Sequence, residues 1–183
     1  MDFSRVWKVG VDERAFLERV QAYAPALRRF AARMTGSPAD AEDVLQETLV
    51  RALQRRGELR DPGQLRSWLF AITRTVSLNA RRGLRHTLEV LEGGLSAETE
   101  ETTVGGNLET EILDRSLSDE LTAALAALSP EHREAIWLRE VEDLSYEEIA
   151  RVVDCELGTV RSRLARARVA LAARLLKENG HGV

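Results

Sequence analysis

The chain of 183 residues is 44% hydrophobic, 31% charged and only 5% aromatic, and its formal net charge is −4. This composition excludes a disordered tail, and the low share of aromatic residues favours helices over sheet. A single cysteine, Cys155, excludes an intrachain disulfide and any zinc cluster held by several thiolates.

Residues 11–33 predict one amphipathic helix, because large apolar side chains recur there at three- and four-residue spacing. The segment Thr35-Gly36-Ser37-Pro38 interrupts the pattern. Ser37 then suits the N-cap of a second helix that ends near residues 55–57, with Pro38 at its first position and acidic residues near the positive end of its dipole. The start of the chain lacks the apolar stretch of a signal peptide, and no window approaches membrane-spanning length, so we expect a cytoplasmic protein.

A loop and a third helix complete the first predicted domain, residues 11–90. The turn residues Asp61-Pro62-Gly63 mark residues 58–64 as a loop. Residues 65–85 predict a helix with apolar residues on one side and arginines elsewhere. Residues 1–90 carry sixteen basic and eleven acidic side chains, which gives this part of the chain a net charge of +5.

An acidic segment separates this domain from a second one. Residues 91–110 are rich in Glu, Thr and Gly and predict a flexible linker. Residues 111–178 form the second predicted domain, in which Ser129-Pro130 restarts a helix with Ser as cap and Pro at the first position. We therefore expect an all-α protein of two small helical domains joined by a flexible acidic linker, the second of which contains a helix-turn-helix.

The helix-turn-helix is predicted for residues 144–168. Ser145 and Glu148 have the spacing of a capping box, and Leu144 and Ile149 occupy the positions of a hydrophobic staple. A short polar break at residues 154–156 precedes a second helix. Many such turns begin with Gly where this chain has Asp154, and Asp tolerates turn geometry better than most residues.

The second helix of this motif predicts binding to the major groove of DNA. Val160 and Leu164 would face the core, while four polar residues would point outward: Arg161, Ser162, Arg163 and Arg166. An arginine fork pairs with phosphate oxygens or with the guanine edge. The segment 157–177 holds six basic residues and no acidic one, so its local charge opposes the negative total. An ordinary amphipathic helix with a solvated basic face is the alternative, which the capped preceding helix and the short turn disfavour.

Three motifs in this order resemble the extracytoplasmic-function (ECF) sigma factors of bacterial RNA polymerase. Residues 154–168 (DCELGTVRSRLARAR) resemble their promoter-binding C-terminal domain, and residues 40–48 (DAEDVLQET) resemble their core-binding helix. Residues 65–72 (LRSWLFAI) resemble the helix after their specificity loop. The resemblance implies that the first domain docks on core RNA polymerase and reads the −10 promoter element, and that the second reads the −35 element. It also implies regulation by an anti-sigma factor.

The resemblance further assigns candidate site residues. Contacts to the −35 element would come from Glu156, Thr159, Arg161, Ser162, Arg163 and Arg166. Contacts to the −10 element would come from Arg60, Asp61, Arg74, Thr75, Asn79, Arg81 and Arg82. Polymerase would meet Asp40, Asp43, Val44, Gln46 and Glu47. Family members often have Asn at the position of Thr75 and Asp at that of Asn79, so the base preference of the −10 pocket stays open.

Several alternatives remain beside this interpretation. A stand-alone helix-turn-helix regulator would share residues 144–168 but would not need the other two motifs. An enzyme is disfavoured, because the chain has no phosphate loop, no dinucleotide fingerprint and no HExxH metal motif, and we expect neither cofactor nor metal. Trp68 suits a core position better than a base-stacking platform. Cys155 suits a small buried hydrophobe better than a redox sensor.

Overall fold

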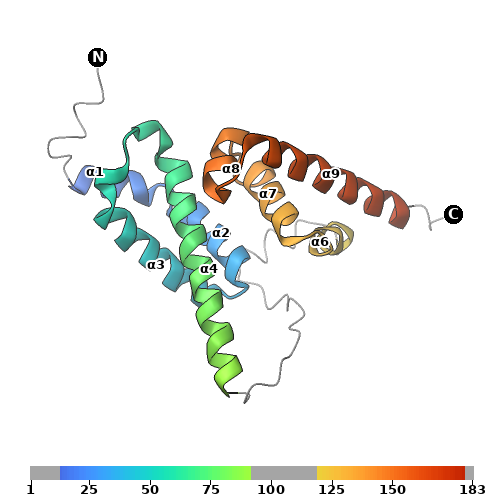
Figure 1. Ribbon diagram of the computed structural model, residues 1–183, viewed down its shortest axis with the longest axis horizontal. Helices are drawn as coiled ribbons and strands as arrows, with labels where there is room; N and C mark the ends of the chain where they lie inside the picture. The colour runs from blue at the N-terminus through green and yellow to red at the C-terminus, as the bar shows by residue number, and fades with distance from the viewer. Residues whose placement is uncertain (1–12, 92–118, 180–183) are drawn as a thin grey trace. The chain divides into compact units, whose positions relative to one another are not determined.

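The computed structural model describes residues 13–91 and 119–179, and every regular element in these two ranges is a helix. The described residues divide into two compact units, one within residues 13–91 and the other within residues 119–179 (Figure 1). This confirms the all-α class with two helical domains. The predicted linker, residues 91–110, lies outside the described residues except for its first position, so its character stays a prediction.

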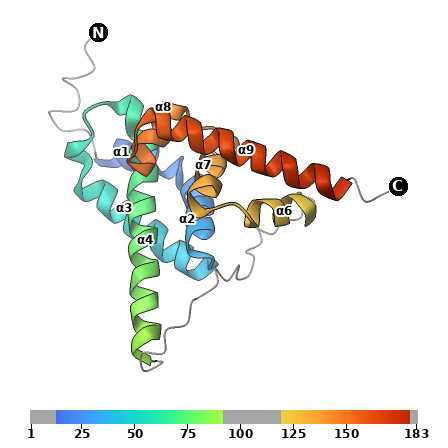
Figure 2. The ribbon, with the colours of Figure 1, turned by 45° about the vertical axis from the view of Figure 1, so that its right-hand side comes forward.

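The described part of the first unit, residues 13–91, forms four α-helices and two short 3-10 turns. The helices are α1 (Glu13–Gln21), α2 (Ala24–Thr35), α3 (Pro38–Gln54) and α4 (Leu65–Leu91), with the turns η2 (Arg56–Glu58) and η3 (Pro62–Gln64) between α3 and α4. The long helix α4 packs against both α2 and α3, and Figure 2 shows it from a second side. It extends beyond the predicted end at residue 85.

The prediction of a single helix over residues 11–33 is wrong. The chain forms α1 and α2 with a break at Ala22–Tyr23, because Pro25 in the first turn of α2 has no N–H to donate to a continuous helix. α2 ends at Gly36, whose φ of 75° is in the left-handed region that glycine enters without steric cost. Two helices therefore cover the sequence for which periodicity alone predicted one.

The core of the first unit is built around aromatic side chains from α1, α2 and α4. Phe16, Phe30 and Phe70 are almost fully buried, and the rings of Phe30 and Phe70 lie 5.3 Å apart with an interplanar angle of 59°. Such tilted pairs add to the free energy of simple burial. Ser37 accepts a hydrogen bond from the Asp40 amide at 3.3 Å, which confirms the predicted N-cap of α3.

Thr48 of α3 offers a test of this core. Its side chain is fully buried, and its hydroxyl has no hydrogen-bond partner among the described residues. Because an unsatisfied buried hydroxyl is costly, Thr48→Val is expected to raise the free energy of unfolding by about 1 kcal/mol. The matched control is Thr73→Val, which removes a hydroxyl that donates to the Leu69 carbonyl at 2.9 Å and should lower stability. Denaturant unfolding of both variants tests the pair, and a loss of stability in Thr48→Val contradicts the prediction.

The second unit contains α6 (Asp119–Ala126), α7 (Pro130–Glu140), α8 (Tyr146–Val153) and α9 (Leu157–Asn179). Ser129 accepts a hydrogen bond from the His132 amide at 3.4 Å, as predicted for a capping serine before Pro130. The core residues Leu138, Leu144, Ile149 and Leu164 are fully buried. None of the helices within residues 13–91 and 119–179 has both the length and the apolar character needed to cross a membrane.

Candidate nucleic-acid interface

The start of α8 is held by the predicted capping box. The Glu148 amide donates to the Ser145 hydroxyl at 3.2 Å, and the Ser145 amide donates to the Glu148 carboxylate at 2.8 Å. Two amide donors at this helix end are thereby satisfied. Leu144 and Ile149 on either side are fully buried, so both the box and the apolar positions around it are confirmed.

The turn between α8 and α9 depends on Asp154. This residue has a φ of 53° and ψ of 59°, and the Cys155 amide closes the turn by donating to the Ala150 carbonyl at 3.1 Å. α9 then begins at Leu157, as predicted. Cys155 is half-buried, and its thiol lies 3.7 Å from the Glu156 carbonyl oxygen, so it is less enclosed than the buried hydrophobe that we expected.

Asp154 supplies a second testable prediction. The left-handed region is sterically unfavourable for residues other than glycine. It is less unfavourable for Asp than for Ala, because the short polar side chain of Asp forms local hydrogen bonds. Asp154→Gly is expected to raise the free energy of unfolding of the second unit by about 0.5 kcal/mol, and Asp154→Ala to lower it by about 1 kcal/mol. Thermal unfolding of the two variants measures this order. Equal stability of the Gly and Ala variants would show that the turn does not constrain this position.

α9 divides into a buried face and an exposed face. Val160, Leu164 and Ala167 are fully buried against the unit's core. Of the six predicted −35 residues, three are exposed, namely Glu156, Arg161 and Arg166, and three are half-buried, namely Thr159, Ser162 and Arg163. Within the described part of the chain no hydrogen bond or ion pair engages Arg161 or Arg166, so both guanidinium groups are available to a ligand. The Ser162 hydroxyl donates to the Thr159 carbonyl at 2.9 Å.

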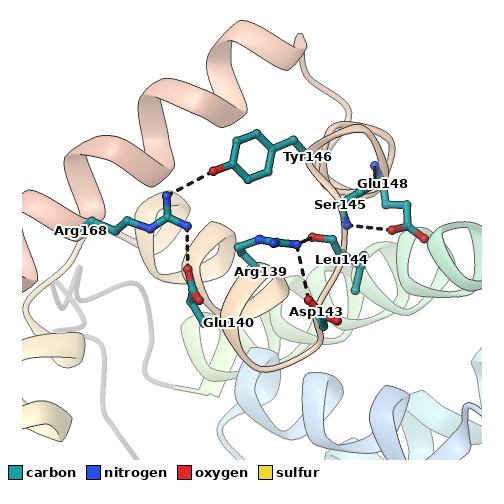
Figure 3. A network of polar contacts seen from close by, with 8 residues as sticks. All are labelled: Arg139, Glu140, Asp143, Leu144, Ser145, Tyr146, Glu148 and Arg168. Carbon is teal, nitrogen blue, oxygen red and sulfur yellow. Dashed lines mark hydrogen bonds and ion pairs between the residues drawn. The ribbon is translucent and has the colours of Figure 1, made fainter.

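Arg168 differs from the other arginines of α9, and sequence reasoning missed its role. Its guanidinium donates to the Glu140 carboxylate at 2.7 Å and to the Tyr146 hydroxyl at 3.2 Å (Figure 3). The hydrogen bond to Glu140 is the main reason why the pKa of Arg168 is raised, and the bond to Tyr146 adds to it. Arg139 joins the same cluster, with its guanidinium carbon 5.7 Å from the centre of the Tyr146 ring and a hydrogen bond of 2.8 Å to the Leu144 carbonyl. No local pattern in the sequence predicts pairs this far apart along the chain.

The predicted −10 residues lie on the loop between α3 and α4 and along α4. Arg60, Asp61, Thr75, Asn79 and Arg82 are exposed, whereas Arg74 and Arg81 are half-buried. Thr75, Asn79 and Arg82 follow one another at helical spacing, so they form a single stripe on α4. The Thr75 hydroxyl donates to the Ala71 carbonyl at 3.0 Å.

The loop itself is ordered by its own polar side chains. The Asp61 carboxylate accepts hydrogen bonds from the Gly63 amide at 2.8 Å and the Gln64 amide group at 3.2 Å, so Asp61 shapes the turn η3. Before it, Arg55 pairs with Glu58, whose pKa is lowered chiefly by that hydrogen bond. Leu59 is buried and anchors the loop to the unit. Trp68 after the loop is only partly buried, so it is not the enclosed core residue that its helical phase predicted.

All five predicted polymerase-facing residues lie on α3, and all of them except Val44 are at least partly exposed. Asp43, Gln46 and Glu47 are exposed, and Asp40 is half-buried. Val44, in contrast, is only 2% exposed and packs in the core of the first unit, so it offers no exposed side chain for the contact expected of it. Helical phase accounts for this, because Val44 shares the inner face with Ala41 and Thr48. The exposed apolar residue of this helix is instead Val50, which is 49% exposed and was not predicted.

Charge on these surfaces is not organised for metal binding. In the described residues no group of three or more His, Cys, Asp or Glu side chains is placed to hold a metal ion. The outer carboxylates of α3 are partly paired, since Glu47 forms an ion pair of 2.6 Å with Arg51 one turn later. What the described surfaces offer is exposed arginine on α9, exposed polar residues on α4 and exposed carboxylates on α3.

Comparison with known proteins places both units in described families. Residues 19–87 match Sigma-70 region 2, and residues 118–171 match Sigma-70, region 4. The chain is 38% identical over 163 residues to the ECF RNA polymerase sigma factor SigE of Mycolicibacterium smegmatis, covering 88% of this chain and 62% of that relative. It thus spans less than two thirds of the length of SigE. It is 35% identical over 156 residues to the ECF RNA polymerase sigma factor EcfG of Rhodopseudomonas palustris, covering 85% of this chain and 82% of that relative.

The fold is also similar to that of solved structures. The sigma factor RpoE of Bartonella quintana, in complex with the anti-sigma factor NepR, superposes with a TM-score of 0.67 at 29% identity, over 88% of this chain and 97% of that one. CnrH in complex with the cytosolic domain of CnrY superposes with a TM-score of 0.59 at 25% identity, over 90% of each chain.

Proposed function

Because the chain belongs to the ECF family of RNA polymerase sigma factors, we propose that it binds core RNA polymerase and directs promoter-specific initiation at −10 and −35 elements. The observation that carries the proposal is the pair Arg161 and Arg166, exposed on α9 behind a capped helix and a closed turn. A helix with free arginines held at a fixed angle is suited to the major groove. Glu156, Thr159, Ser162 and Arg163 lie beside this pair on or near the same helix end.

The first unit would contribute the second promoter contact and the polymerase contact. Exposed Thr75, Asn79 and Arg82 on α4, with Arg60 on the loop, supply hydrogen-bond donors for a single strand and its phosphates. Half-buried Arg74 and Arg81 lie along one side of this stripe. Asp43, Gln46 and Glu47 on α3 supply a polar surface for polymerase, to which we add Val50 as an apolar contact.

A stand-alone helix-turn-helix regulator is not favoured, because the first unit matches Sigma-70 region 2 over residues 19–87. We further propose that the protein acts by binding, without catalysis or cofactor, in the cytoplasm. An anti-sigma factor is a proposed partner, since the similar RpoE of Bartonella quintana is solved in complex with the anti-sigma factor NepR.

The test is transcription in vitro with core RNA polymerase on a pool of randomised promoters. We expect the purified chain to form a holoenzyme and to enrich templates with two conserved elements at a constant spacing. Core polymerase without the chain is the control. Failure to form a holoenzyme, with DNA binding by the chain alone, would instead support a stand-alone regulator.

The isolated chain is expected to bind promoter DNA weakly and with strong dependence on salt. Its net charge of −4 opposes DNA, so that only local basic patches attract phosphate. Counterion release then makes the observed affinity fall steeply between about 50 and 200 mM salt. Fluorescence anisotropy across a salt series measures this, and tight binding that does not change with salt would contradict it.

A further inference from the structure

Arg168 is one of the six basic residues in the segment 157–177 of α9. Unlike Arg161 and Arg166, it is hydrogen-bonded to side chains of two other helices. We propose that Arg168 is a positioning residue, which together with Glu140 and Tyr146 sets the angle of α9 and does not itself contact DNA. This inference rests on the proposed function, because it explains how the −35 reading helix is held. Three helices of the second unit meet in the cluster: α7 through Glu140, α8 through Tyr146 and α9 through Arg168 (Figure 3).

The geometry gives each member a separate contact. One nitrogen of the Arg168 guanidinium reaches Glu140 at 2.7 Å, and the other reaches the Tyr146 hydroxyl at 3.2 Å. Tyr146 is the first residue of α8, directly after the capping serine. Arg139 of α7 lies over the Tyr146 ring, 5.7 Å from its centre, and forms an ion pair of 3.5 Å with Asp143. Tyr146 therefore contacts Arg139 through its ring and Arg168 through its hydroxyl, which links the beginning of α8 to both neighbouring helices.

Position along α9 explains why this matters for reading DNA. Arg161 precedes Arg168 by seven residues, which is close to two helical turns, so the two side chains project from the same side of α9 about 10 Å apart along its axis. Arg161 has no partner in the described residues, whereas the charge of Arg168 is balanced by Glu140. A small rotation of α9 about this contact would displace Arg161 and Arg166 together.

Stability alone does not account for the cluster. The Arg168 and Glu140 side chains are 47% and 52% exposed, and a surface ion pair of this kind contributes little to folding. Promoter binding depends more strongly than stability on the orientation of α9, because contacts to bases in the groove tolerate little displacement. We therefore expect substitutions here to affect promoter binding far more than the unfolding temperature.

The competing possibility is that Arg168 leaves Glu140 and binds a phosphate when DNA arrives. The two roles predict opposite effects for Glu140→Gln in the holoenzyme built from the full chain. A positioning role predicts about threefold to tenfold weaker binding to a promoter selected by the wild type, since the lost pair couples directly to the reading helix. A phosphate role predicts equal or tighter binding, because the substitution releases Arg168 and removes a negative charge near DNA.

The matched control is Glu147→Gln, which removes the same charge from an exposed position of α8. It is expected to leave binding unchanged or slightly tighter. Tyr146→Phe keeps the ring beside Arg139 but removes the hydroxyl, and it should weaken binding in the same direction as Glu140→Gln. Arg168→Ala should do so as well, while Arg168→Lys retains the pair with Glu140 and restores part of the loss.

Two readouts separate positioning from a structural or a phosphate role. Thermal unfolding of each variant should stay at the wild-type value, and the slope of log affinity against log salt should not change, because no phosphate contact is lost. A slope reduced by about 0.9 in Arg168→Ala, or unchanged binding in both Glu140→Gln and Tyr146→Phe, overturns the proposal. Arg166→Ala in the same assay separates the positioning role of Arg168 from the proposed reading of the −35 element by α9. If Arg166→Ala weakens binding while the cluster variants do not, only the positioning role fails. If a variant with both Arg161 and Arg166 replaced by Ala is also without effect, α9 does not read the promoter, and the proposed −35 contact fails together with the positioning role.

Discussion

Arg166→Ala is expected to weaken recognition of the −35 element by about 1–3 kcal/mol, the cost of one lost bidentate contact to a base edge. Arg166 is exposed on α9 and has no ion pair in the described part of the chain, so its fork is free to meet a base. The measurement is holoenzyme binding to a selected promoter and to a version with single changes in the −35 element. The ratio between the two affinities should fall in the variant.

The control for this variant is Arg174→Ala. Arg174 is also exposed but lies eight residues further along α9, beyond the helix-turn-helix. Its loss is expected to lower affinity for every sequence by a similar factor, as for a purely electrostatic contribution, without changing discrimination. If Arg166→Ala leaves the discrimination between promoters as it was, Arg166 is not part of the base readout.

Leu164→Ala is expected to lower the free energy of unfolding of the second unit by about 2–5 kcal/mol. Leu164 is fully buried, and it anchors α9 between the buried residues Val160 and Ala167. Truncation removes apolar burial and leaves a cavity that surrounding helices fill only in part. Denaturant unfolding followed by circular dichroism measures the loss of stability. Promoter binding should decline as well, because α9 is no longer packed firmly against the core of the second unit.

Leu176→Ala provides the same chemical change on the same helix. Leu176 is 73% exposed, so its truncation removes little buried surface and is expected to change stability by less than about 0.5 kcal/mol. A difference between the two leucines of less than about 1 kcal/mol would contradict the assignment of Leu164 to the core.

Local chemistry accounts for the parts of the fold that could be predicted. The caps at Ser37, Ser129 and Ser145 each join a side chain to an amide three residues later, so the spacing in the sequence contains the whole interaction. The break between α1 and α2 was missed although Pro25 is visible in the sequence. There the apolar periodicity continues across the break, and the missing donor of proline outweighs it.

In the candidate site, too, some features could be predicted from the sequence and others were missed. The exposed arginines Arg161 and Arg166 follow from helical phase relative to Val160 and Leu164, which the sequence displays directly. The burial of Val44 was not foreseen, because a resemblance between motifs transfers a role without stating which face of α3 packs inward. The exposed Val50 was overlooked for the same reason.

By itself the sequence determined the helical class, the capped helix-turn-helix and the arginines that its second helix presents, since each depends on residues a few positions apart. Only the tertiary structure decided which of those arginines is free. Arg168 is 28 residues from Glu140 and 22 from Tyr146, and only the packing of α7, α8 and α9 brings them within hydrogen-bond distance. Interactions between such distant positions depend on the angles at which helices cross, and the spacing of residues along one helix does not specify those angles.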